Sequence, residues 1–138
     1  MKNPEIQATT DANVQVTGKP TLILGASLKS HRASNTAIQM LRDTGHSVYA
    51  LGLRAGRVAD VDIATSLADL DLPPLHTITL YLNAQRQTAF YDTIFDLQPK
   101  RLIFNPGAEN PELKALATER GIECVEACTL VLISSHWF

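Results

Sequence analysis

The chain has 138 residues, of which 45% are apolar and 19% charged, and its formal net charge is −2. This length fits one domain, and the composition is too apolar for a disordered chain. The weak negative charge argues against duplex nucleic acid as a partner, and no apolar run approaches the ~20 residues that a membrane span needs. Because no secretory leader opens the chain, we expect a single cytoplasmic domain with neither a nucleic-acid nor a membrane partner.

The first half of the chain changes from a polar start to alternating apolar and amphipathic stretches. Residues 1–18 show no helical period and predict a flexible tail, which leaves residues 19–138 as the folded domain. Gly25 stops the first apolar run, and Gly45 ends the first amphipathic stretch. The predicted elements are a strand over Thr21–Leu24, a helix capped by Ser34 or Asn35, strands over Ser47–Leu51 and Val61–Ala64, and a helical turn over Ser66–Leu70.

The second half repeats this alternation of strands and helices. Asn83 predicts the cap of a helix that runs through Leu97 with Ala89, Phe90 and Ile94 on its inner face. Asn110 followed by a proline predicts the start of a second helix, which Gly121 ends. The predicted strands are Thr77–Leu82, Arg101–Phe104 and Glu123–Ala127, and the apolar stretch Thr129–Phe138 is expected to pack back on the core.

Strands that alternate with helices predict an α/β fold. Right-handed crossovers then give a Rossmann-like, doubly wound, mostly parallel sheet with helices on both faces, ordered 3-2-1-4-5-6 in chain numbering. Ligands of such sheets bind at the carboxyl ends of the strands, where the order reverses between strands one and four. The segments expected around this crevice are Gly25–Leu28, Leu51–Arg57, Asn83–Ala84 and Asn105–Gly107.

The turn after the first strand is suited to a phosphate group. Gly25 permits a tight turn without a Cβ, and the backbone N–H groups that follow lead into a helix N-terminus. Arg32 precedes that helix and adds a positive charge. Residues 18–57 contain six Lys or Arg and one Asp, a local excess of five positive charges. We therefore expect the first half of the chain to hold a small polyanion; a chance cluster of solvated side chains is the alternative.

The sequence lacks the fingerprint of a dinucleotide-binding protein. The second and third glycines of GxGxxG are missing after Gly25, and no carboxylate follows the second strand until Asp60. Arg54 stands where an acid would contact the ribose diol of NAD. An arginine at that position disfavours NAD and leaves NADP or a 3′-phosphorylated adenosine ligand open.

Several short motifs occur together in a fixed order. They are Gly25-Ala-Ser27, Arg32-x-Ser34-Asn35, Leu41-x-x-x-Gly45-His46-x-Val48, Asn105-Pro-Gly107-Ala108, Ala117-x-x-x-Gly121-Ile-Glu and Cys128. In this order and spacing, over roughly residues 19–132, the chain resembles the small stand-alone bacterial CoA-binding-domain proteins, which are related to the CoA-binding domain of the succinyl-CoA synthetase alpha subunit. The resemblance implies CoA as the ligand. The expected partner is therefore a small-molecule nucleotide, CoA or acyl-CoA, and a homodimer and a partner enzyme are both left open.

Carried over by position, the resemblance implies which residues contact CoA. Its pyrophosphate would lie at Gly25, Ala26, Ser27, Leu28, Arg32, Ser34 and Asn35, and its adenosine against Leu53, Arg54, Asn83 and Ala84. Three segments depart from the family pattern. Gly52-Leu53 replaces an Asn-Pro pair, Leu82-Asn83-Ala84 replaces an arginine-rich turn, and Ile103-Phe104-Asn105 replaces a Trp-x-Gln segment.

No catalytic or metal-binding set is evident. Cys124 and Cys128 fall on or after a buried strand without a nearby base, Ser27 has no nucleophile-elbow frame, and His31 and His46 have no partner in sequence. The favoured hypothesis is therefore a non-catalytic module that binds CoA or acyl-CoA. An NADP-dependent oxidoreductase and a scaffold that has lost nucleotide binding remain as alternatives.

Overall fold

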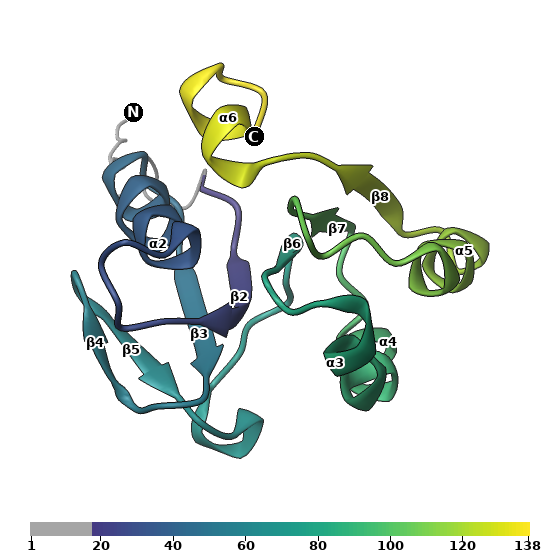
Figure 1. The fold of residues 1–138 in the computed structure, drawn as a ribbon, viewed down its shortest axis with the longest axis horizontal. Helices are drawn as coiled ribbons and strands as arrows, with labels where there is room; N and C mark the ends of the chain where they lie inside the picture. The colour runs from purple at the N-terminus through teal and green to yellow at the C-terminus, as the bar shows by residue number, and fades with distance from the viewer. Residues whose placement is uncertain (1–17) are drawn as a thin grey trace, which may run out of the picture.

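A computed structural model describes residues 18–138, so the expected tail, residues 1–18, lies outside the described residues except for Gly18. Within the described part, seven strands form one sheet in the order β4-β5-β3-β2-β6-β7-β8 (Figure 1). The strands are β2 (Thr21–Ala26), β3 (Val48–Gly52), β4 (Gly56–Val58), β5 (Val61–Ala64), β6 (Thr77–Leu80), β7 (Arg101–Phe104) and β8 (Glu123–Glu126). This is the predicted Rossmann-like α/β fold.

All neighbouring strands pair in parallel except β4 and β5. The six parallel strands follow the predicted order, with β2 between β3 and β6. Strand β4 was not predicted, and it adds an antiparallel edge. A two-residue turn joins it to β5, and Ala59 adopts a φ of 54° there. The turn residues Ala59 and Asp60 lack the Asn-Gly or Asp-Gly signal by which such hairpins are recognised in a sequence.

Helices cover both faces of the sheet (Figure 1). Helices α2 (Ala33–Asp43) and α6 (Thr129–Ser134) pack with one buried cluster, which includes Ile23 of β2. The other face carries α3 (Ala84–Gln87), the 3₁₀ turn η2 (Thr88–Phe90), α4 (Tyr91–Leu97), α5 (Pro111–Glu119) and the 3₁₀ turn η1 (Leu67–Asp69). Leu22 and Leu24 belong to that second cluster. Side chains of β2 thus pack into two buried clusters, one on each face, because successive side chains of a strand alternate across the sheet. No helix among residues 18–138 has the length and hydrophobicity that a membrane crossing requires.

The single helix predicted over residues 83–97 is wrong, because the chain forms α3, η2 and α4 instead. The preceding strand also ends at Leu80, two residues earlier than predicted. Gln87 is fully buried, and its Nε2 donates to the carbonyl oxygens of Leu82 (2.8 Å) and Ala108 (2.7 Å). These bonds tie the first turn to neighbouring loops, and Ala89, predicted to face inward, is exposed. Only Ile94 of the predicted inner face is fully buried.

The stretch from Thr129 packs back on the core as predicted, with Ile133 and Phe138 buried. Phe138 lies at the amino-terminal edge of the sheet. Lys19 Nζ (2.6 Å) and Arg101 Nη1 (3.1 Å) both donate to its carbonyl oxygen. The Arg101 guanidinium is 4.5 Å from the centre of the Phe138 ring, and the His46 ring contacts the same ring edge-on at 5.0 Å. The ring and the carbonyl oxygen of Phe138 therefore contact both the Lys19 ammonium and the Arg101 guanidinium.

His46 must be neutral in this arrangement. Its Nδ1 accepts a hydrogen bond from the Lys19 backbone N–H (2.9 Å), which a protonated ring cannot do. Burial, followed by the charges of Lys19 and Arg101, lowers the pKa of His46 below its ordinary 6.5. Burial and the same two charges, with that of Lys100, also lower the pKa of His76, which a nearby glutamate only partly opposes.

We expect the free energy of unfolding to fall as the pH drops below about 6.5, because the unfolded chain then binds protons that the folded chain resists. His46→Gln should remove part of this pH dependence, and His76 should account for another part. His31→Gln, at an exposed position, serves as the control substitution. Urea denaturation at a series of pH values measures the slope; equal slopes in the wild type and His46→Gln would contradict the prediction.

Candidate functional site

A cleft of ≈ 740 Å³ lies at the carboxyl ends of β2, β3, β5 and β6. This is the expected position for a ligand of a doubly wound sheet, and the volume is in the range of small-molecule sites. Eight of the eleven residues predicted for the site line the cleft: Gly25, Ala26, Ser27, Leu28, Arg32, Ser34, Leu53 and Arg54. Asn35, Asn83 and Ala84 do not line it.

Gly25 allows β2 to turn sharply at the floor of the cleft. Its φ is +102°, a conformation that residues with a side chain rarely adopt. A Cβ at this position would lie 3.1 Å from Leu82 Cδ2 and equally close to the backbone carbon of Tyr81. The pairing of β2 with β3 also shifts between Leu24 and Ala26. Both the positive φ of the turn and the close approach of Tyr81 and Leu82, which follow β6, therefore require glycine.

The loop from Ser27 to Arg32 is held by short-range hydrogen bonds. Ser27 Oγ accepts from the Lys29 backbone N–H (3.1 Å), and Asn35 Nδ2 donates to the Ser27 carbonyl oxygen (3.0 Å). Asn35 thus supports the loop from beneath without lining the cleft. Helix α2 begins at Ala33, so Ser34 and Asn35 lie inside its first turn and neither is the N-cap, as predicted for one of them. Arg32 is the N-cap residue and uses no side-chain hydrogen bond.

The start of α2 offers unpaired donors to the cleft. Helix α2 has 11 residues, and the first N–H groups of any helix lack partners inside it. Ala33 and Ser34, in its first turn, both line the cleft beside Arg32. Partial positive charge at a helix N-terminus adds to that of the arginine. An anion, such as a phosphate, is the group that this arrangement favours.

The end of β3 forms a second wall. Gly52 lies so close to β2 that a Cβ would collide with the Ala26 carbonyl oxygen, so no side chain fits there. Leu53 follows with 77% of its surface exposed, and Arg54 stands exposed next to it. Leu28, which is 41% exposed, lies over Gly56. Apolar surface and a cation therefore occur side by side at the rim.

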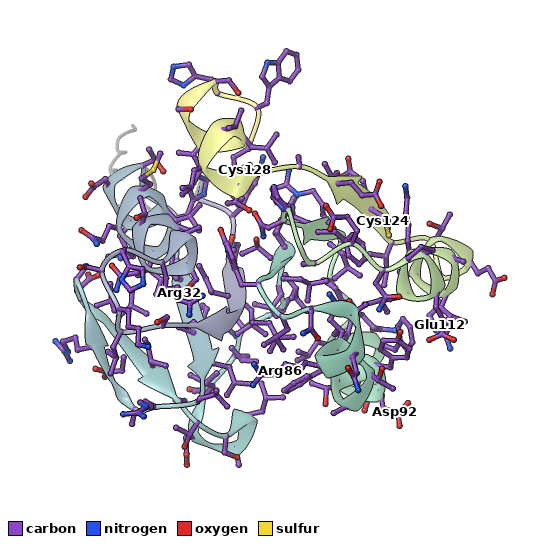
Figure 2. All side chains as sticks on the ribbon, viewed as in Figure 1. Arg32, Arg86, Asp92, Glu112, Cys124 and Cys128 are labelled. Atoms are coloured by element: carbon purple, nitrogen blue, oxygen red, sulfur yellow. The ribbon has the colours of Figure 1, made fainter. Side chains whose placement is uncertain are left out.

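The wall opposite Arg32 comes from α3 and η2. Asn83 caps α3, as predicted, by accepting a hydrogen bond from the Arg86 backbone N–H (2.9 Å), and this role keeps it out of the cleft. Arg86 and Phe90 line the cleft instead, together with Tyr81. Figure 2 shows Arg32 and Arg86 on opposite sides of β2. Sequence reasoning missed Arg86 because it assigned the contact to the residues immediately after the strand.

Charges in the cleft are of one sign. Lys29, Arg32, Arg54 and Arg86 line it, and the described lining residues include no Asp or Glu. None of these four cations forms an ion pair within residues 18–138. Outside the cleft, Arg42 pairs with Asp60 (2.8 Å) and Arg57 with Asp62 (2.9 Å). Of the six cations in residues 18–57, three thus line the cleft, and two others are paired with aspartates outside it.

Groups suited to proton transfer do not gather in the cleft. The described lining residues include no His or Cys, and His46 lies at the opposite edge of the sheet. Burial raises the pKa of Tyr81 to about 12, so its phenol stays protonated. Burial also raises the pKa of Cys124. In the same part of the chain, no three His, Cys, Asp or Glu side chains form a group that would hold a metal ion.

The fold and the cleft define a Rossmann-like α/β domain with a basic cleft at the carboxyl edge of its sheet. The chain belongs to the CoA-binding-domain family, whose match extends over residues 19–134. This confirms the resemblance recognised in the sequence motifs. No curated protein matches the chain.

Solved structures share this fold. An uncharacterized protein is 40% identical, with a TM-score of 0.80 over 88% of this chain and 98% of that one. The protein cell-free ID.343 from Thermus thermophilus is 21% identical, with a TM-score of 0.76 over 92% and 96% of the two chains. A hypothetical protein from Pyrococcus horikoshii OT3 is 19% identical, with a TM-score of 0.76 over 98% and 97%. The last two are similar in fold alone.

We expect Gly25→Val to lower the free energy of unfolding by about 1–3 kcal/mol through backbone strain, and by more through contact with Leu82 and Tyr81. Gly45→Val is the matched control: Gly45 has a φ of +91°, but a Cβ there meets nothing within 4 Å. Chemical denaturation of both variants measures the difference. An equal loss in the two variants would show that crowding at the cleft floor contributes nothing.

Proposed function

We propose that this protein binds CoA or an acyl-CoA in the cleft and does not itself catalyse a reaction. The observation that carries the proposal is the set of four cations that line the cleft, none of which forms an ion pair within residues 18–138, without any carboxylate among the described lining residues. CoA is a polyanion with a diphosphate and a separate ribose phosphate, so such a cleft complements it. Membership of the CoA-binding-domain family supports the same ligand.

In this proposal the two ends of the nucleotide occupy different walls. The diphosphate lies against the turn from Gly25 to Leu28 and the start of α2, with Arg32 as its charged partner. The adenosine lies between Leu53–Arg54 and the wall that begins at Asn83 and Ala84. Rossmann-like proteins hold a ribose at the end of the second strand of the fold, which is β3 here. The exposed Leu53 supplies apolar surface for a base.

A binding role without chemistry fits the residues at hand. Ser27, in the turn proposed to hold the diphosphate, accepts a hydrogen bond from the Lys29 backbone and has no His, Asp or Glu among the described lining residues. Neither cysteine lines the cleft. We therefore propose that any reaction of the thioester takes place on a partner enzyme, with this protein as the carrier or regulator.

CoA should stabilise the folded protein more than NAD does. A ligand that binds only the folded state raises the free energy of unfolding by RT ln(1 + [L]/Kd), about 2.7 kcal/mol at a hundredfold excess over Kd. Thermal unfolding with CoA, acetyl-CoA, NADP and NAD at equal concentrations gives the ranking. A larger shift with NAD than with CoA would contradict the proposal, and no shift with any of the four would favour a scaffold without a nucleotide.

Arg54→Ala should weaken CoA binding about tenfold, because a charge-assisted hydrogen bond contributes roughly 1.5–3 kcal/mol. The planar guanidinium matches phosphate oxygens in pairs, and we propose the ribose 3′-phosphate as its partner. Dephospho-CoA lacks this phosphate and should bind the wild type and the variant alike. Calorimetry with both ligands and both proteins completes the cycle. Equal weakening of the two ligands would assign Arg54 to another part of the nucleotide.

A further inference from the structure

We propose that Arg86 and Arg54 form a clamp that binds, from opposite walls of the cleft, the phosphomonoester on the adenosine ribose of the ligand. This inference rests on the proposal that a nucleotide occupies the cleft, and it makes Arg86 a specificity-determining residue. The shared chemistry has two sources, the 3′-phosphate of CoA and the 2′-phosphate of NADP, and the experiment separates them.

The sheet brings the two arginines within reach of one group. β3 and β6 pair with opposite sides of β2, and neighbouring strands lie about 4.8 Å apart, so the ends of β3 and β6 are separated by about 10 Å. Arg54 comes two residues after β3, and Arg86 lies on the helix that follows β6. Both side chains line the same cleft. Because the two arginines follow these strand ends and line one cleft, a phosphate bound between β3 and β6 can contact both.

The backbone of Arg86 is fixed before any ligand binds. Its N–H donates to the capping Asn83 Oδ1. The next residue, Gln87, is fully buried, donates to two loop carbonyl groups and accepts from Asn110 Nδ2 (2.9 Å). The guanidinium of Arg86, in contrast, has no ion pair or hydrogen bond with residues 18–138. A fixed backbone and a guanidinium without a partner among the described residues are the features expected of a residue that binds an anionic ligand.

The distribution of cations favours a phosphomonoester over the diphosphate as the partner of Arg86. Lys29, Arg32 and the first amides of α2 already surround the turn proposed for the diphosphate. Arg54 and Arg86 are the remaining cations of the cleft, and they come from the segments that follow β3 and β6. A ribose bound at the end of the second strand of the fold, β3, would lie near them. A phosphomonoester carries a charge of about −1.5 to −2 at neutral pH, which two guanidinium groups match.

Calorimetric titration of the wild type, Arg86→Gln, Arg54→Gln and the double variant with CoA and dephospho-CoA tests the clamp. Arg57→Gln is the matched control, because Arg57 is exposed, pairs with Asp62 and does not line the cleft. Arg86→Gln should weaken CoA about tenfold and dephospho-CoA by less than about twofold. In the double variant the preference for CoA over dephospho-CoA should disappear. Arg57→Gln should bind both ligands as the wild type does.

Further arms keep failure of the clamp distinct from failure of the CoA proposal. Arg86→Gln that weakens CoA and dephospho-CoA equally, or neither, overturns the clamp while CoA binding stands. If NADP binds more tightly than NAD and CoA does not bind, loss of that preference in Arg86→Gln upholds the clamp and overturns CoA as the ligand. A wild-type protein that binds none of CoA, dephospho-CoA, NADP and NAD overturns both the clamp and the CoA proposal. Thermal unfolding of each variant verifies that it is folded.

Discussion

Because β2 pairs in parallel with β3 on one side and β6 on the other, the carboxyl ends of three neighbouring strands meet at one edge of the sheet. Each strand is buried on both faces, so its loops must leave at that edge and turn back over a helix. The chain accommodates this crowding with two glycines, Gly25 at a positive φ and Gly52 against the Ala26 carbonyl group. The cleft is the space that remains between these loops.

The electrostatics of the cleft follow from which cations the fold neutralises. Arg42 and Arg57 meet aspartates at the β4–β5 hairpin, and Lys19 is used at the opposite edge, against Phe138. The cations of the cleft have no such partners among the described residues. Unpaired positive charges that lie close together repel one another, and a bound anion reduces this repulsion. An anionic ligand would therefore complete the charge balance at this edge.

Buried polar side chains hold the walls of the cleft in place. Asn105 Nδ2 donates to Thr79 Oγ1 (2.7 Å) and to the Leu80 carbonyl oxygen (2.9 Å), and its Oδ1 accepts from the Thr129 backbone N–H. One side chain thus joins β6, the end of β7 and the start of α6. Gln87 does the same for α3 and the loops around it. Such fully satisfied networks are rigid, so the backbone of Arg86, which adjoins Gln87, is positioned before a ligand binds.

The fold class, the order of the parallel strands and the tight turn at Gly25 could be predicted from the sequence, since apolar periodicity, Gly25 and the family motifs are local signals. Arg32 and Arg54, which were also predicted for the site, line the cleft. That Arg86 lines the cleft, and Asn83 and Ala84 do not, follows only from the tertiary structure. Hydrogen bonds from Gln87 to distant carbonyl groups break the predicted helix there and set its orientation. Contacts between segments far apart in the chain leave no periodic trace, so no local pattern reveals them.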